Sequence, residues 1–420
     1  MLNTLSGILN IPDLRKKFMY TLGFMVLFRL GTHVPVAGVD PVKLAQIFSQ
    51  GGLVGFVDLF TGGALAKFSI FAMGIIPYIN ASIIIQLLTV VIPQLEALAK
   101  EGESGRKQIA QYTRYLAIAL AAVQSFGTAF WFRGVLLPGY SFPLFLVSSI
   151  IALTAGTALV MWIAELMTEF GIGNGASMLI FVGIVSRMPS YIGSTIILIK
   201  GGASMLGLII LLVAFLAMIV AIVCVQEGQR KIQVQYAKRV VGRKVYGGQA
   251  TFLPIRINQG GVIPIIFASA VLLFPATIGQ FVPNDFVRGI INSLSPSGSL
   301  YMWLYFFLVF FFTYFYTAIT FNPTELAENI KKYGGFVMGI RPGKPTAEYL
   351  EYVITRLTLV GATFLAVIAV VPTIVEGFTH ITSFQGLGST ALLIMVGVAL
   401  DLVRQIETHL VARQYEGLLA

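Results

Sequence analysis

Charged residues are scarce in this chain, and cysteine and histidine are almost missing. Only 11% of the 420 residues are Asp, Glu, Lys or Arg, whereas soluble domains carry about 25%. A surface this poor in charge excludes an ordinary soluble protein. One cysteine, Cys224, excludes an intramolecular disulfide. The three histidines, His33, His380 and His409, are too few and too scattered to suggest a zinc site.

Apolar residues take the place of the missing charge. They make up 57% of the chain and give a mean hydropathy of +0.86. Ten runs are continuously apolar over about twenty residues, the length at which a helix crosses hydrocarbon. None shows the alternation of a barrel strand. The sequence therefore predicts an all-α integral membrane protein with ten transmembrane helices, near residues 18–34, 71–92, 112–132, 143–164, 174–193, 205–225, 260–282, 300–320, 353–375 and 389–407.

Basic residues predict the orientation of these spans. With ten spans both termini lie on one side, and 21 of the 28 Lys and Arg residues fall on that side. The loops at 226–259 and 321–352 carry many of them. Lys and Arg concentrate on the cytoplasmic side of membrane proteins. We therefore expect both termini in the cytoplasm, and most of the net charge of +10 reflects this topology.

Two spans share a motif. Residues 74–82 read GIIPYINAS and residues 261–269 read GVIPIIFAS, so six of nine positions are identical. Each motif lies in the second span of a five-span half, and the two spans cross in opposite directions. This placement predicts two inverted halves, 1–200 and 201–420, with the functional pathway between them. Two unrelated helices that each need a Gly-Pro entry would show the same pattern.

The segment 53–67 reads LVGFVDLFTGGALAK and is too short to span. It is either a re-entrant half-helix inside a cavity or an interfacial helix on the outer surface, and its residues alone leave both open. Charges within the spans are few. Arg29 can snorkel to the outer interface, and Asp401 lies one turn from Arg404 and can pair with it.

Five blocks of sequence are distributed along nearly the whole chain. They are FTGGALAKFSIFAMGIIPYINASIIIQLL at 60–88, KEGESGRKQIAQYTRY at 100–115, GIGNG at 171–175, the loop 227–254 with YAKR and GRKVYGGQ, and GIRPG at 339–343. Together they resemble the bacterial members of the SecY family. The resemblance implies a channel that threads unfolded polypeptides across the bacterial cytoplasmic membrane and releases apolar segments sideways into lipid. It also implies a re-entrant plug helix in a central pore.

The resemblance assigns a pore ring, a plug and a lateral gate. A ring of aliphatic side chains dewets a narrow waist and blocks ions. Ring positions four residues apart share a helix face, although Ala176 is smaller than the bulky residue usual in the family. Spans two and seven would form the gate. The implied ring is Ile75, Ile79, Ala176, Ile180, Ile266 and Ile394, and the implied plug, 53–67, includes Leu53, Asp58, Phe60, Gly62, Gly63 and Lys67.

Partners and docking residues also follow from the resemblance. Exposed Lys and Arg suit the RNA phosphates of a ribosome, and the turn-rich stretch 240–249 predicts a projecting hairpin. No cofactor is implied, and without a P-loop pattern the energy must come from partners. The implied partners are the small membrane subunits SecE and SecG, the SecA motor ATPase, the ribosome, signal peptides, nascent chains and membrane lipid. The implied docking residues are Arg106, Lys107, Lys238, Arg239, Arg243, Lys244 and Arg341.

Two other classes of membrane protein fit the sequence less well than a channel. A secondary transporter with inverted repeats needs buried ionisable or polar clusters at the midplane, where this sequence has mainly isoleucine. An intramembrane enzyme needs a catalytic pattern such as GxSxG, HExxH or GxGD, and the sequence contains none of the three. A channel is therefore the favoured interpretation, with the transporter as the alternative.

Overall fold

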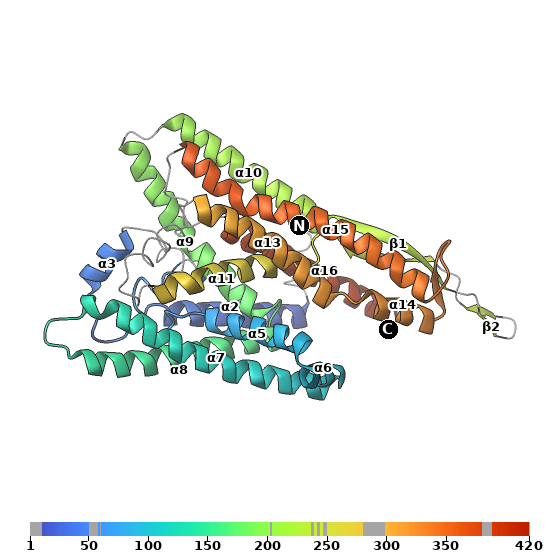
Figure 1. Ribbon diagram of the computed structural model, residues 1–420, viewed down its shortest axis with the longest axis horizontal. Coiled ribbons are helices and arrows are strands. Elements are labelled where there is room, and N and C mark those ends of the chain that lie inside the picture. The colour runs from blue at the N-terminus through green and yellow to red at the C-terminus, as the bar shows by residue number, and fades with distance from the viewer. Residues whose placement is uncertain are drawn as a thin grey trace.

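Ten long helices dominate the described part of the protein. The computed structural model describes residues 11–49, 58, 60–201, 204–236, 239–241, 244–246, 250–279, 299–379 and 389–419. Each of the ten predicted spans coincides with a helix, and most of these helices run along the long axis of the molecule (Figure 1). They are α2 (Pro12–Gly31), α5 (Ile76–Val91), α7 (Glu103–Trp131), α8 (Phe142–Phe170), α9 (Gly175–Lys200), α10 (Met205–Glu227), α11 (Ile263–Gly279), α13 (Ser299–Thr320), α15 (Lys344–Thr379) and α16 (Ser389–Leu419).

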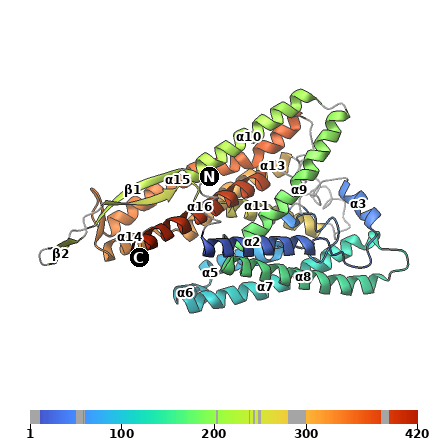
Figure 2. The same ribbon diagram turned by 180° about the vertical axis from the view of Figure 1, so that it is seen from behind.

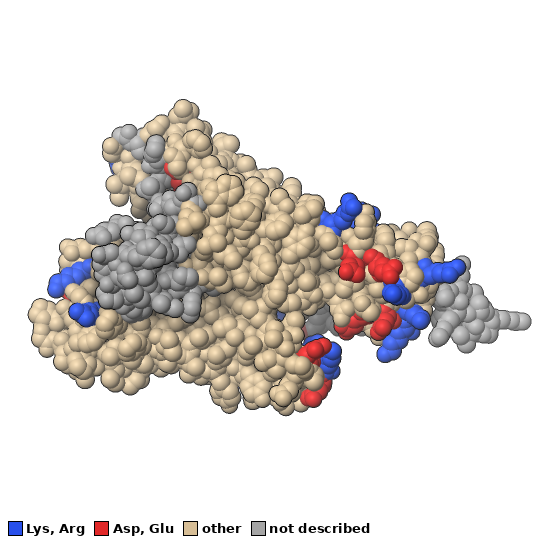
Figure 3. All heavy atoms as spheres, viewed as in Figure 1, with Lys and Arg blue, Asp and Glu red and all other residues tan. Residues whose placement is uncertain are grey.

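Length and hydropathy alone identify six of these helices as spans in the described part of the chain. They are α7 with η1 (Phe132–Val135), α8, α9, α10, α13 with α14 (Pro323–Lys332), and α15. Helix α5 and the short α6 (Pro93–Lys100), bent by 100°, count as a seventh. Helix α2 is not among them because several basic residues lie near its start. Helix α11 is not among them because it has only 17 residues. Figure 3 supports membrane crossing, because charged side chains on the visible face gather at the two ends of the molecule and leave a wide band without charge.

The helices pack mainly with partners from their own half. In the first half, α7 packs against α5 and α8, and α2 runs along α8 (Figure 2). In the second, α15 packs against α10 and α13, and α11 against α13. Contacts between the halves join α9 to α16 and α5 to α11. This packing supports a division near residue 200, which stays a prediction.

The internal repeat has a counterpart in the backbone. Gly74 and Gly261 occupy equivalent motif positions and have φ angles of +56° and +59°. Glycine adopts this region without steric cost. Helices α5 and α11 then begin two residues later, and each has proline as its second residue, where a missing N–H costs nothing. For the same reason the predicted span 71–92 is helical only from Ile76, and residues 71–75 form buried turns.

A small sheet extends the molecule beyond the helices (Figure 1). Strands β1 (Gln229–Tyr236) and β4 (Ala250–Arg256) pair antiparallel, and β2 (Arg239–Val241) and β3 (Lys244–Tyr246) continue toward the tip. The predicted hairpin is therefore confirmed. Strand β5 (Gly335–Val337), which the sequence did not predict, pairs with the other edge of β1. Buried Ile232, Val234 and Ile255 hold the sheet against α14 and α15.

Candidate pore and plug

The six predicted ring residues meet in one hydrophobic cluster. Ile75, Ile180 and Ile394 are buried members, with at most 2% of their surface exposed. Ile79, Ala176 and Ile266 are partly buried and pack against the same cluster. These residues come from α5 and the turn before it, α9, α11 and α16, so the cluster lies where α9 meets α16 and α5 meets α11. Ala176 is part of it despite its small side chain, and the function of the ring stays a prediction.

The predicted plug lies inside the protein. Residues 53–57 and 59 fall outside the described residues, but Asp58, Phe60 and Thr61 are buried. Phe60 and Ala64 pack in the same cluster as the ring. The chain is helical to Thr61 and continues through turns to α5. An interfacial helix would expose this segment, so that alternative is wrong and the re-entrant segment is confirmed.

The base of the plug is fixed by a second hydrophobic cluster. Phe68 is fully buried and packs edge-on against Phe132, with ring centroids 5.4 Å apart. Its carbonyl accepts a 2.9 Å hydrogen bond from the Val36 N–H. The backbone of Phe68 has a φ of +45°, a conformation that persists only where surrounding contacts hold it. The chain at Phe68 is therefore held through both its side chain and its backbone.

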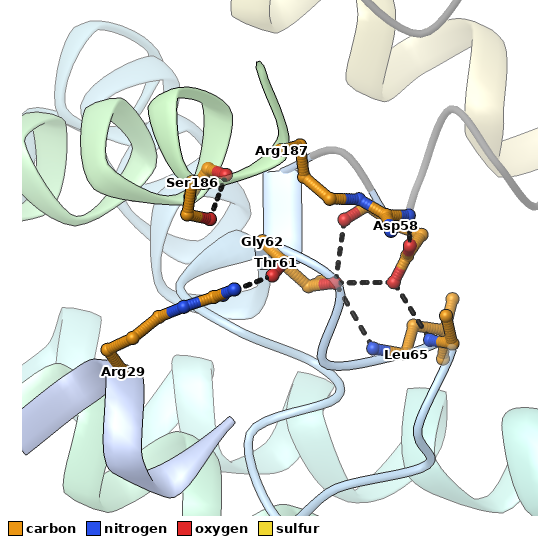
Figure 4. A network of polar contacts seen from close by, with 9 residues as sticks. Arg29, Asp58, Thr61, Gly62, Leu65, Ser186 and Arg187 are labelled. Atoms are coloured by element: carbon orange, nitrogen blue, oxygen red, sulfur yellow. Dashed lines mark hydrogen bonds and ion pairs between the residues drawn. The ribbon is translucent and has the colours of Figure 1, made fainter. Parts of the chain in front are cut away.

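Polar contacts join the plug to two helices (Figure 4). Asp58 forms an ion pair with Arg187 of α9, and its Oδ1 accepts a 2.8 Å hydrogen bond from the Ala66 N–H. Arg29 of α2 donates from Nη1 to the Gly62 carbonyl at 2.6 Å. Arg29 therefore points inward and does not snorkel to the outer interface, because a buried carbonyl needs a donor.

Sequence reasoning missed Arg187. It lies within the predicted span 174–193, where a charged residue is costly and usually functional. That signal was available, because no other Lys or Arg occurs in this span. The partner could not be identified, because Asp58 is 129 positions away in the sequence.

The described docking residues lie in the hairpin, in the turn before α15 and at the start of α7. Arg341 is exposed in a tight turn between β5 and α15, and its carbonyl accepts a 2.8 Å bond from Thr346 Oγ1. Arg106 and Lys107 are exposed in the first turns of α7, and Lys107 pairs with Glu103 at 2.9 Å. Arg239 and Lys244 lie in the β2–β3 hairpin, whereas Lys238 and Arg243 fall outside the described residues.

Arg404 links α16 to the base of the hairpin. The expected contact with Asp401 is present at 3.5 Å, but shorter bonds reach Glu227 Oε1 at 2.7 Å and the Gln226 carbonyl at 2.8 Å. Because Glu227 ends α10 just before β1, Arg404 fixes the direction in which the hairpin leaves the helices.

A helical bundle that closes on an aliphatic cluster and on a buried segment of its own chain defines a membrane protein of the channel class. The chain belongs to the SecY family, which it matches over residues 69–403. The protein translocase subunit SecY of Synechococcus elongatus is 48% identical over 417 residues, covering 97% of this chain and 94% of the relative. That of Thermus thermophilus is 46% identical over 432 residues, covering 100% and 98%.

Solved structures show the same fold. A chain described as "The structure of a protein conducting channel" has a TM-score of 0.67 and 16% identity, covering 94% of this chain and 92% of that one. A second is described as "The plug domain of the SecY protein stablizes the closed state of the translocation channel and maintains a membrane seal", with a TM-score of 0.67, 18% identity and the same coverage. A third, "Sec61 in the Canine ribosome-channel complex from the endoplasmic reticulum", has a TM-score of 0.61 and 16% identity, again covering 94% and 92%.

Proposed function

We propose that this chain is a protein-conducting channel that moves unfolded polypeptides across a membrane and releases apolar segments sideways into lipid. One observation carries the proposal: the aliphatic cluster between the two sets of helices is in contact with a buried segment of the chain itself. The relatives that cover nearly the whole chain are named as translocase subunits.

The chemistry of the aliphatic ring suits an unspecific passenger. Dispersion contacts are individually weak and have no direction, so the ring can close around any side chain. Apolar constrictions also block ions by dewetting. The ring residues come from four different helical regions, and a small outward movement of these helices widens the waist without breaking a polar bond between ring side chains.

Lateral release requires a seam from the waist to lipid. Helices α5 and α11 carry the two copies of the repeat and touch where the halves meet. Both contribute to the ring, through Ile79 and Ile266. Separation of these two helices would open the waist toward the bilayer, and we assign them as the lateral gate.

The sheet and the loops beside it are the proposed docking surface for cytoplasmic partners. Related channels have been seen in a "ribosome-channel complex" and "bound to the yeast 80S ribosome". Arg341 is exposed on a turn whose backbone is fixed by a hydrogen bond from Thr346. It is the strongest candidate for contact with ribosomal RNA or with SecA. We further propose SecE and SecG as membrane-embedded partners. The proposed location is the bacterial inner membrane, with both termini in the cytoplasm, because Lys and Arg concentrate on that side.

Site-specific crosslinking to a stalled secretory chain tests this function. A photoreactive residue at position 79 or 266 should label the arrested chain, and the same residue at Leu216, exposed on α10, should not. Crosslinks from Leu216 without crosslinks from the ring positions would exclude this pathway. Labelling of a small solute in place of the chain would favour the transporter.

A further inference from the structure

The plug is held on its two sides by different helices. Its Asp58 side chain is fully buried and reaches Arg187 on α9, and its Gly62 carbonyl accepts from Arg29 on α2 (Figure 4). Arg187 also keeps a buried Nε without a hydrogen-bond partner among the described residues. The Asp58 carboxylate is the acidic group that pairs with this guanidinium.

Close backbone packing adds to these polar contacts. A Cβ on Gly62 would lie 2.8 Å from the Cα of Gly183, which is closer than real Cβ atoms approach. Gly183 precedes Arg187 by one helical turn, so both lie on the same face of α9. Small residues at both positions let the plug backbone reach α9 and bring Asp58 within range of Arg187.

Asp58 also organises the plug internally. Its Oδ1 accepts from the Ala66 N–H and from Thr61 Oγ1, at 2.8 and 3.3 Å, and Thr61 Oγ1 in turn accepts from the Leu65 N–H. One carboxylate therefore closes the turn of the plug and binds it to the channel wall. Loss of the Arg187 contact leaves a buried carboxylate uncompensated, which strongly favours its exposure to water.

We propose that Arg187 is the residue that sets the threshold for opening. The Arg187–Asp58 pair is a latch that holds the plug at the ring, and Arg29 is its second point of attachment. A signal sequence must supply the free energy to separate this pair, so the latch decides how weak a signal can be and still open the channel. This inference rests on the assignment of residues 53–67 as the plug.

Removal of the latch should make the channel leaky and less selective. In proteoliposomes holding the channel with its membrane subunits, Arg187→Gln should raise basal potassium efflux on the order of tenfold. We expect a smaller rise in efflux than the loss of a fully buried ion pair would cause, because the Arg187 side chain is 26% exposed. In cells, the same variant should export a reporter whose signal sequence carries a charge in its apolar core.

A charge swap separates a latch from general damage. Asp58→Arg combined with Arg187→Asp should be tighter than Asp58→Arg alone, which places two cations together, although an arginine at position 58 cannot accept from the Ala66 N–H. Arg133→Gln is the matched control, because Arg133 stacks over the Phe130 ring and takes part in none of the plug contacts described above. If Arg187→Gln does not accumulate in the membrane, Asp58→Asn and the swapped pair carry the same test.

Comparison with a plug deletion distinguishes the latch from the plug itself. A channel that lacks residues 58–66 should leak ions whether or not a latch exists. A leaky deletion together with a tight Arg187→Gln or Asp58→Asn channel would overturn the latch and leave the plug assignment standing. A tight deletion would overturn the plug assignment. A swapped pair that is no tighter than Asp58→Arg alone would also overturn the latch.

Discussion

Ile75, Ile180 and Ile394 reach the central cluster from different parts of the chain, and each packs there against other apolar side chains. Substitution of one such residue by another of similar volume changes packing by less than about 1.5 kcal/mol. A polar side chain at the same place would attract water into a waist that must stay dry. Bulk and polarity therefore matter at these positions more than the identity of any one side chain.

Ring variants test this view directly. Ile79→Val or Ile266→Leu should leave ion efflux and export almost unchanged, since the cluster keeps its apolar character. Asn at both positions together should hydrate the waist, raise basal efflux several-fold and allow export with defective signal sequences. The measurement is efflux from proteoliposomes beside export of a reporter in cells. Normal sealing by the double Asn variant would contradict the ring assignment, and strong effects of the conservative changes would favour a binding site.

Single residues also show the limits of sequence reasoning. The four-residue spacing of Ile75 and Ile79 indicates a shared helix face, but only the family resemblance distinguishes them from lipid-facing isoleucines. Arg29 was expected at the outer interface, but it turns inward to the Gly62 carbonyl. This partner is a backbone group, so no pattern of side chains in the sequence reveals it. Contacts between distant segments depend on how helices pack, and one sequence does not encode that packing in a readable local pattern.

At the scale of elements, the turn between β5 and α15 presents Arg341 to solvent without constraining its side chain. Gly339 and Gly343 have φ angles of +82° and +102°, so the turn is tight on both sides of the arginine. The buried Thr346 donates to the Arg341 carbonyl and fixes the backbone. An ordered backbone that carries an exposed arginine is suited to docking, because little conformational entropy is lost when a partner binds.

Charge reversal at this turn should separate docking from topology. Arg341→Glu should reduce protein export at least several-fold, because a partner that binds the arginine would face a like charge. Insertion and orientation should be normal, since the other basic residues on that side still satisfy the positive-inside pattern. Lys332→Glu, at the exposed end of α14, is the matched control. Export rates measure docking, and the protease sensitivity of the loops measures orientation. Unimpaired export by Arg341→Glu would show that Arg341 contributes only to the orientation of the spans.

Elements were easier to predict than contacts, for a physical reason. A helix that crosses hydrocarbon must satisfy its own backbone and be apolar over about twenty residues, so all ten spans could be located from composition along the chain. The start of α5 was misplaced by five residues because the turns at 71–75 are as apolar as the helix that follows. Strand β5 has three residues and forms only by pairing with β1, which its own sequence does not indicate.

On the scale of the whole molecule, each half has helices that pack chiefly among themselves. Buried Phe68, Phe132 and Phe145 belong to a cluster formed entirely by the first half, and buried Leu365 and Leu392 belong to one formed by the second. The central cluster is shared by both halves. Only the short connection between Lys200 and Ser204 joins the halves covalently. Such a link contributes mainly loop-closure entropy. For a short loop this contribution to the free energy is small compared with that of the apolar area buried between the halves.

A chain cut between Lys200 and Ser204 should therefore still form a channel. Fragments 1–200 and 201–420, expressed together, should copurify and retain at least part of the export activity. The basic residues that follow α10 remain available to orient the second fragment. A cut inside α15 is the control, because it divides a span and leaves helix ends in hydrocarbon. If the two fragments copurify and support export, and the control loses both properties, the result would support two halves that meet at the pore. Separate purification of intact, inserted fragments would show that the halves do not hold together through the central cluster.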